Sequence, residues 1–215
     1  MVSYLIAAII GYIAGSLPFG LILTCLCGYL AGSVPFGLVL TRLAGLGDIR
    51  KIGSGNIGTT NVLRTGHKGL ALLTLILDVF KAAFAALLCK YLFSEPVGYF
   101  AGIIAVIGHN YPIWLKFKGG KGVASTLGLM LAMTPCVGIL TCLTWLIVAL
   151  IWHYSSLAAL TALAAAPIYA FVSGNEAATV TYALLTLLSY YRHRGNIKRL
   201  IEKKESKISF HKKAA

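Results

Sequence analysis

The sequence has 215 residues, of which 58% are hydrophobic, and its mean hydropathy is +0.83. This composition is far above that of a soluble domain and predicts an all-α polytopic membrane protein, because helices satisfy their own backbone polar groups in lipid. The formal charge of +13 arises from 19 lysines and arginines against 6 acids. These charges gather in loops and in the C-terminal tail, so they indicate contact with anionic membrane lipid, and no nucleic-acid partner is expected.

Metal ligands and common catalytic motifs are missing from the sequence. The five cysteines form no C-x-x-C pair and lie in or beside apolar runs, while the six acids are scattered. Neither a zinc site nor a divalent-cation site is therefore expected, and no cofactor is predicted. There is no Gly-x-Ser-x-Gly elbow, and no histidine is followed five residues later by an acid. Any reaction must run on cationic and amide contacts, without a metal or an evident nucleophile.

The N-terminal part of the chain contains an internal repeat. The segment Gly11–Thr24 recurs almost unchanged as Gly28–Thr41. Only the second copy continues into Arg42 and a polar loop, so we predict that it is the functional copy and that residues 1–27 are a duplicated hydrophobic lead-in. The uncharged stretch up to Thr41 is long enough for two short spans, or for one span with a re-entrant lead-in, and both possibilities stay open.

Six further apolar runs follow the polar loop Gly45–Gly69. The expected spans are Leu70–Leu92, Val97–Leu115, Val123–Met133, Cys136–Trp152, Leu157–Val172 and Ala177–Tyr191. Together with Gly28–Thr41 they give about seven transmembrane helices, although several are shorter than the ~20 residues that cross a bilayer. We predict a membrane-embedded domain over residues 28–200 and a basic, solvated cytoplasmic tail over residues 201–215.

The distribution of positive charge orients this layout. All but two of the 19 lysines and arginines fall on one side of it, the exceptions being Lys81 and Lys90. The positive-inside rule therefore places the Gly45–Gly69 loop, the loop after Leu115 and the C-terminus in the cytoplasm. The side on which the N-terminus lies depends on whether the first repeat copy spans the membrane.

The polar segment Gly53–Arg64 is rich in groups that bind anions. Three glycines permit a tight backbone, and Arg64 supplies a planar fork suited to phosphate. Its neutral hydrogen-bonding side chains are Ser54, Asn56, Thr60 and Asn61. The spacing does not match a Walker A loop. A flexible loop in which Thr60 or Asn61 caps a short helix is the alternative, but we favour a functional site.

A second candidate site is the Lys–Gly loop, residues 116–122. It contains three lysines and three glycines, which are Lys116, Lys118, Gly119, Gly120, Lys121 and Gly122. Bare N–H groups of such a loop form an anion-binding concavity, and a helix beginning at Val123 adds its positive end. The alternative is a loop whose lysines only fix topology. The paired glycines favour a ligand, because topology requires none.

A few polar residues stand out in the apolar runs or at their ends. Asp78 and Lys81 lie three residues apart, so we expect them to pair with each other or with a neighbouring span. His109, near the inner end of its span, can contact phosphate, act as a base or make a structural hydrogen bond, and these readings are evenly balanced. Ser156 is either a site donor or part of a helix cap.

The basic segment that begins the tail contains two residues that lipid attraction does not explain. The segment runs from Arg192 to Leu200 and attracts anionic lipid at about 1 kcal/mol per charge. His193 and Asn196 add no fixed charge to it. We therefore include both as candidate site residues.

Taken together, these stretches resemble the bacterial PlsY family of acyl-phosphate:glycerol-3-phosphate acyltransferases. The resemblance rests on Ala31–Gly37, Gly53–Arg64, Gly108–Pro112, Phe117–Ser125 and His193–Arg199, in this order, and covers nearly all the chain from Gly28 onward. It implies seven transmembrane helices in the bacterial inner membrane, an outside N-terminus and a cytoplasmic active site.

The resemblance also implies the reaction. The family transfers an acyl group from acyl phosphate to the 1-hydroxyl of sn-glycerol 3-phosphate, giving lysophosphatidic acid and phosphate in phospholipid biosynthesis. It implies no metal, no cofactor and no acyl-enzyme, with a substrate phosphate assisting proton removal. The expected partners are the two substrates, membrane lipid and the enzyme that makes acyl phosphate.

Residue roles follow from the resemblance. The implied catalytic residues are Ser54, Arg64, Lys121 and His193. The implied substrate-binding residues are Asn56, Thr60, Asn61, His109, Lys116, Lys118, Gly119, Gly120, Gly122, Ser156 and Asn196. We expect the glycine-rich loops to hold phosphate, and Arg64 with Lys121 to bind glycerol 3-phosphate; the exchanged assignment stays open.

Two features depart from the family pattern. The N-terminal duplication is one, and Thr59, which stands where the family usually has alanine, is the other.

Two other classes of function are the alternatives to acyl transfer. A transporter of a phosphorylated metabolite should carry charges along several spans, whereas only Asp78 and Lys81 do so. An inactive scaffold would require the duplication to have disrupted the fold, and the intact loop motifs argue against that.

Overall fold

A computed structural model describes residues 19–208, and all regular structure in that range is helical. Before the Lys–Gly loop lie α2 (Phe19–Ser33), α3 (Phe36–Leu43), η1 (Ile49–Lys51), α4 (Thr59–Leu63), α5 (Lys68–Leu92), α6 (Glu95–Asn110) and η2 (Ile113–Leu115). After it lie α7 (Val123–Met133), α8 (Pro135–Trp152), α9 (Ser155–Val172), α10 (Glu176–Arg192) and α11 (Arg194–Ile201). The chain is thus an all-α polytopic membrane protein, as predicted.

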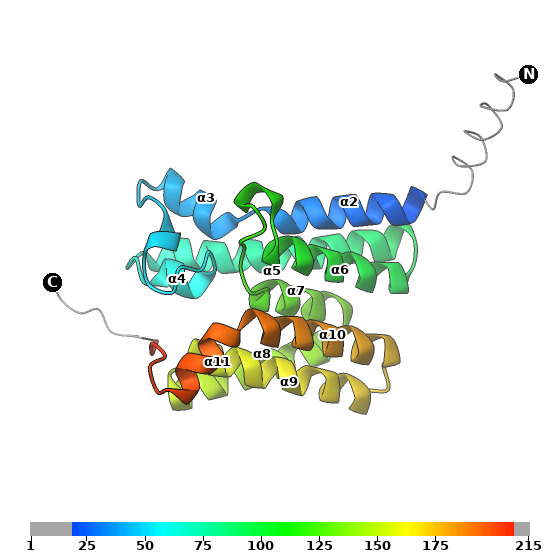
Figure 1. The fold of residues 1–215 in the computed structure, drawn as a ribbon. Helices are drawn as coiled ribbons and strands as arrows, with labels where there is room; N and C mark the ends of the chain where they lie inside the picture. Colours follow the sequence, from blue (N-terminus) through cyan, green and yellow to red (C-terminus); the bar gives the residue numbers. More distant parts are fainter. Residues whose placement is uncertain (1–18, 209–215) are drawn as a thin grey trace, which may run out of the picture.

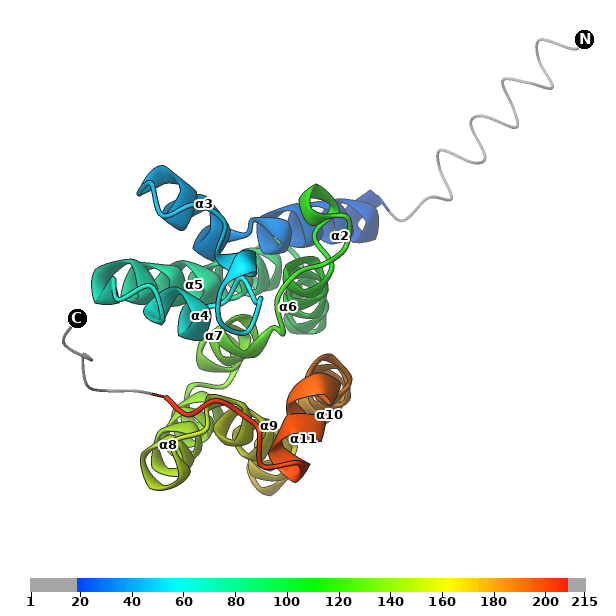
Figure 2. The same cartoon turned by 60° about the vertical axis from the view of Figure 1, so that its left-hand side comes forward.

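The helices form two groups joined by the short helix α7. In Figure 1, α2, α5 and α6 run side by side in one group and α8, α9 and α10 in the other, with α7 between them. Figure 2 shows the same division from another direction. α7 packs against α5 and α6 on one side and against α8 on the other. The short helices α3, α4 and α11 gather at one end of the bundle, opposite the described beginning of α2.

Several helix boundaries agree closely with the expected spans, and two regions differ. The expected span Val97–Leu115 ends as helix α6 at Asn110, because Pro112 holds the preceding residue out of the helical region: Tyr111 has φ −134° and ψ 57°. The expected span Gly28–Thr41 falls on two helices, α2 and α3, which are bent by 41° at a break that contains Val34 and Pro35.

The number of membrane-crossing helices stays a prediction. Within residues 19–208, α5, α8 and α9 are each long and apolar enough to cross a membrane, and the bent pair of α2 and α3 forms a fourth candidate. Helix α2 runs through the expected boundary at residue 27, so the end of the first repeat copy continues directly into the second. Residues 1–18, which hold most of the first copy, lie outside the described part.

Small residues allow the helices to approach closely. A Cβ on Gly32 of α2 would lie 2.0 Å from the carbonyl oxygen of Ala105 in α6, and one on Gly128 of α7 would lie 2.0 Å from that of Val79 in α5. Alanines fill much of the core between the helices. Lipid tails are as apolar as leucine, so close packing of this kind is what holds membrane helices together.

Gly32→Ala is therefore expected to destabilise the protein by about 1–3 kcal/mol, because the new methyl group must push two backbones apart. Gly69→Ala is the matched control, since Gly69 lies in the first turn of α5 and nothing lies within 4 Å of its Cβ position. The control should change the free energy of unfolding by less than about 1 kcal/mol. Unfolding in detergent measures both variants, and equal losses would contradict this packing argument.

A buried ion pair ties four helical segments together. The ammonium of Lys81 donates to Asp78 Oδ1 at 2.8 Å, which confirms the expected intrahelical pair. It also contacts His109 Nδ1 in α6 at 2.8 Å and donates to the carbonyl of Val34, at the break between α2 and α3, at 3.0 Å. Ser125 of α7 donates to the backbone carbonyl of Asp78 at 2.9 Å. Both charged side chains are almost completely buried.

Candidate active site

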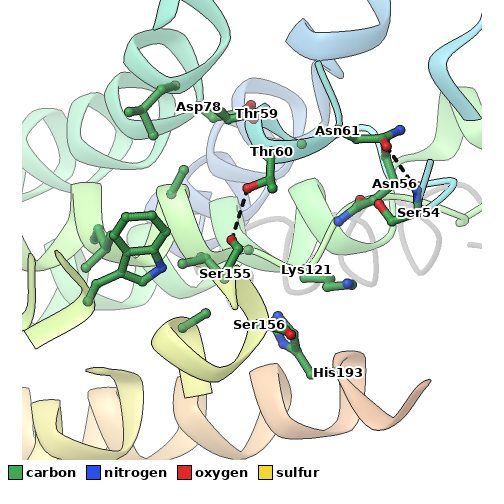
Figure 3. Close-up of a pocket in the computed structure, with 18 of the residues that line it drawn as sticks. Ser54, Asn56, Thr59, Thr60, Asn61, Asp78, Lys121, Ser155, Ser156 and His193 are labelled. Atoms are coloured by element: carbon green, nitrogen blue, oxygen red, sulfur yellow. Dashed lines mark hydrogen bonds between the residues drawn. The ribbon is translucent and has the colours of Figure 1, made fainter. Parts of the chain in front are cut away.

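A cavity of about 430 Å³ lies between the two helix groups. Its polar side chains come from the Gly53–Arg64 segment, the Lys–Gly loop, the start of α9, the junction of α10 and α11, and the chain after α11. In the view of Figure 3, Lys121 lies between Thr60 on one side and Ser156 and His193 on the other. Residues distant in sequence thus meet at one site.

Most of the residues predicted for the site line this cavity. They are Ser54, Asn56, Thr60, Asn61, Arg64, His109, Lys121, Gly122, Ser156, His193 and Asn196. Four predicted residues do not line it: Lys116, Lys118, Gly119 and Gly120. The side chains of Lys116 and Lys118 are exposed, so the cavity receives one lysine of the Lys–Gly loop.

Asn61 organises the Gly53–Arg64 segment. Its side-chain N–H group donates to the backbone carbonyls of Ile49, Ile52 and Asn56 at 2.7, 3.2 and 2.8 Å. Its side-chain oxygen accepts from the N–H of Ser54 at 3.0 Å. The amide of Asn61 is therefore used within the loop, and its effect on the cavity is to shape the backbone that carries Ser54 and Asn56.

Hydroxyl groups line the wall where α4 faces α9. Thr60 and Ser155 share a hydrogen bond of 3.1 Å between their hydroxyls (Figure 3). The neighbouring Thr59 also lines the cavity, and its Oγ1 is buried with no hydrogen-bond partner among residues 19–208. A buried hydroxyl without a partner lowers the stability of the folded protein by about 1–3 kcal/mol. Having threonine at position 59, where the family usually has alanine, therefore has a physical cost.

The glycine pair of the Lys–Gly loop serves close packing within the protein. The N–H groups of Gly119 and Gly120 donate to the carbonyls of Asn110 and His109 at 3.2 and 3.0 Å. A Cβ on Gly120 would lie 1.9 Å from His109 Nε2. The sequence predicted that these N–H groups would bind an anion. The structure differs, because both N–H groups already donate to carbonyls of the protein. Helix α7 does begin at Val123, as expected, with Gly122 at φ +79° before it.

Lys121 projects into the cavity and meets α11. Its ammonium donates to Asn196 Oδ1 at 2.5 Å. Burial is the main cause that lowers the pKa of Lys121 to about 8, and nearby arginines act in the same direction. The lysine therefore keeps its charge at neutral pH but loses it a few units earlier than an exposed lysine does.

His193 is held in one tautomer beside Lys121. Its Nδ1–H donates to the backbone carbonyl of Ser189 at 2.8 Å, which leaves Nε2 unprotonated. Burial, followed by the positive charge of Lys121, lowers the pKa of His193 to about 4. The ring is neutral at physiological pH and offers an acceptor.

The chain after α11 folds back over the cavity. The Glu205 carboxylate accepts from Ser156 at 2.9 Å, from Asn196 at 2.6 Å and from Arg199 at 2.6 Å. Arg64 donates to the Ser206 hydroxyl at 2.5 Å. The sequence predicted a solvated tail over this stretch, so neither Glu205 nor Ser206 was among the expected site residues. The available signal was the presence of two acids, Glu202 and Glu205, within a strongly basic segment.

The other end of the cavity is apolar. Its lining side chains come from α5, α7 and α8, and they include Leu75, Val79, Leu127, Leu131, Cys142 and Trp145. Asp78 and His109 of the buried ion-pair network also reach the cavity wall. A cationic and hydroxyl-rich end that continues into an apolar end suits a molecule with an anionic head and a hydrocarbon tail.

Comparison with known proteins assigns the chain to a family. A family model described as glycerol-3-phosphate acyltransferase matches residues 22–203. This chain belongs to the glycerol-3-phosphate acyltransferase family. It is an integral membrane acyltransferase, and the resemblance noted in the sequence is confirmed.

Relatives match this acyltransferase over almost its full length. A glycerol-3-phosphate acyltransferase of Rhodospirillum rubrum is 59% identical, with 98% of this chain and 93% of the relative covered. One of Paramagnetospirillum magneticum is 55% identical, with 99% and 98% covered. The alignments therefore include nearly all of the segments that line the cavity.

Two crystal structures of PlsY (YgiH), an integral membrane glycerol 3-phosphate acyltransferase, share the fold. The glycerol 3-phosphate form is 38% identical with a TM-score of 0.84, covering 88% of this chain and 96% of that one. The lysophosphatidic acid form is 37% identical with a TM-score of 0.81, covering 87% and 94%.

Proposed function

We propose that this acyltransferase moves an acyl group from acyl phosphate to the 1-hydroxyl of sn-glycerol 3-phosphate, giving lysophosphatidic acid and phosphate. The observation that carries the proposal is one cavity in which Arg64 and Lys121 adjoin an apolar end lined by α5, α7 and α8. The solved relatives in glycerol 3-phosphate and lysophosphatidic acid forms support the same acceptor and product.

The chemistry fits residues that position substrates and stabilise charge. Acyl phosphate is a mixed anhydride, so its carbonyl carbon is already electrophilic. The 1-hydroxyl oxygen forms the new C–O bond, and the bond to phosphate breaks with its electron pair leaving on phosphate. The hydroxyl proton passes to an oxygen of the substrate phosphate, so neither an acyl-enzyme nor a metal is required. Neutral His193 lies where it can accept a hydrogen bond from the acceptor.

Charge compensation is the main task of the cations. Two anions 4 Å apart repel by ~4 kcal/mol at an effective dielectric constant of 20. Arg64 and Lys121 line the same cavity and lower this repulsion. We assign them to glycerol 3-phosphate, with Ser54, Asn56 and Thr60 toward the acyl phosphate; opposite effects of their substitutions on the two KM values would reverse the assignment.

Membrane placement follows the same proposal. Polar residues of the cavity belong to the Gly53–Arg64 segment, the Lys–Gly loop and α11. The helices α3, α4 and α11 lie at one end of the bundle (Figure 1), and these segments carry many of the basic residues. The positive-inside rule makes this the cytoplasmic side of the bacterial inner membrane. Glycerol 3-phosphate then enters from the cytoplasm, and acyl phosphate comes from the enzyme that makes it.

The pH dependence of acyl transfer should report Lys121. Because its pKa is about 8, the cation that binds phosphate is lost as the pH rises through this value, and kcat/KM should fall on the alkaline side. Lys121→Arg keeps the charge to above about pH 12. A pH profile of each enzyme checks this: the alkaline limb should be absent in the variant, and an identical limb in both would contradict the role of Lys121.

Donor choice tests the proposed reaction. Purified protein in detergent, with a metal chelator, would be given glycerol 3-phosphate and either acyl phosphate or an acyl-coenzyme A thioester. We expect lysophosphatidic acid and inorganic phosphate to form in equal amounts with acyl phosphate, and no product with the thioester. Transfer from the thioester, or activity that returns only on adding a divalent metal, would refute this donor and mechanism.

A further inference from the structure

Arg192, the last residue of α10, forms hydrogen bonds with the Lys–Gly loop. It was not among the site residues predicted from the sequence. Its Nε donates to the carbonyl of Gly120 at 3.1 Å, and its Nη2 donates to the carbonyls of Gly119 and Gly120 at 3.0 and 2.9 Å. The guanidinium carbon lies 4.8 Å from the centre of the Tyr111 ring. One side chain thus binds two consecutive carbonyls and stacks on Tyr111, the residue that follows α6.

The same two glycines are held from the other side by the end of α6. Their N–H groups donate to the carbonyls of His109 and Asn110. The donors and acceptors of both residues are therefore engaged, and the backbone before Lys121 is fixed between α6 and α10. This fixed backbone directs the Lys121 ammonium toward Asn196, 2.5 Å away.

We propose that Arg192 is a positioning residue for acyl transfer, whose guanidinium fixes the Gly119 and Gly120 carbonyls and thereby holds Lys121 in the cavity. The inference rests on the proposed function. Arginine suits this task because its planar fork directs several N–H groups in fixed directions, whereas a lysine ammonium is a single point donor on a flexible stem. A misplacement of about 1 Å at a reacting group can cost roughly 100-fold in rate.

Arg192 also contributes to the electrostatic surroundings of Lys121. The charged or titratable side chains that act on Lys121 from the elements around it are Arg64, Arg192, His193, Arg199 and Glu205. Burial is the largest cause of the lowered pKa of Lys121, and the positive charge of Arg192 adds to it. Removing that charge should raise the pKa of Lys121 and move the alkaline limb of the pH profile upward.

Arg192→Gln, Arg192→Lys and the control Arg194→Gln test the inference. Arg194 lies two residues further on, is exposed, and stacks on Tyr191, 4.7 Å away. We expect Arg192→Gln to lower kcat/KM roughly tenfold and to raise the alkaline midpoint by roughly 0.5 pH unit. Arg192→Lys should lose about threefold without moving the midpoint, because it keeps the charge but not the fork. Arg194→Gln should match the wild type.

A second readout is independent of activity. The pH dependence of Lys121 acetylation by acetic anhydride, followed by peptide mass spectrometry, measures its pKa directly, and Arg192→Gln should raise it. Unchanged acetylation, or a loss of activity accompanied only by a lower unfolding temperature, would reduce Arg192 to a structural role. A wild-type protein without acyl transfer would overturn the proposed function, whereas the acetylation result would still show whether Arg192 acts on Lys121.

Discussion

Arg64→Ala should lower kcat/KM for acyl transfer by at least about 100-fold while leaving the protein folded. The expected size is that of removing one preorganised donor from developing negative charge. Arg64 lines the cavity and donates to Ser206 at 2.5 Å, and no carboxylate within residues 19–208 pairs with it. Its guanidinium is therefore available to a phosphate, to which it can donate two parallel hydrogen bonds.

Two variants make the Arg64 result specific. Arg64→Lys keeps the charge but loses the fork, so we expect activity between those of the wild type and Arg64→Ala. Arg50→Ala removes an exposed arginine that pairs with Asp48 outside the cavity, so we expect activity close to that of the wild type. Initial rates at several concentrations of each substrate measure these effects. Equal losses in Arg64→Ala and Arg50→Ala would show that only the general positive charge of the surface matters.

Lys81→Met should destabilise the protein by about 3–5 kcal/mol, the largest loss of stability that we expect from one substitution. The change leaves the buried Asp78 carboxylate without its ammonium partner, and an uncompensated buried charge is costly. It also frees the carbonyl of Val34 and one side of the His109 ring. Unfolding by a denaturing detergent, followed by intrinsic fluorescence, measures the loss.

The double variant Asp78→Asn with Lys81→Met separates lost charge pairing from lost packing. Removing both charges should recover much of the stability, because no buried ion is left unpaired. Lys90→Met is the control at the exposed end of the same helix, where Lys90 lies 3.8 Å from Glu95 and a change of less than about 1 kcal/mol is expected. A double variant no more stable than Lys81→Met would contradict the charge-pairing explanation.

The sequence predicts the helices well because lipid demands long apolar runs. Helix α7 has the expected bounds, and α5, α8, α9 and α10 begin and end within two residues of expectation. The errors lie at prolines. Pro112 ends α6 early, and Pro35 lies in the break between α2 and α3. A hydropathy pattern does not show these ends, because the residues beyond each break are still apolar.

Site residues are predictable where chemistry leaves few alternatives. Arg64, Lys121 and His193 lie in short polar segments and meet in one cavity, although their roles in catalysis stay predictions. The glycine pair shows that a sequence motif does not identify its contact partners. Gly119 and Gly120 indicate a close approach, but the sequence does not show that His109 and Arg192 are what approach them. Glu205 was missed because its partners lie on α9 and α11.

The most direct test is a structure of this protein with glycerol 3-phosphate bound. We predict that the phosphate lies within hydrogen-bonding distance, about 2.7–3.2 Å, of Arg64 or Lys121, with the 1-hydroxyl directed toward the apolar end of the cavity. Glycerol 3-phosphate bound instead by Lys116 and Lys118, outside the cavity, would contradict the assignment of this cavity as the site of acyl transfer.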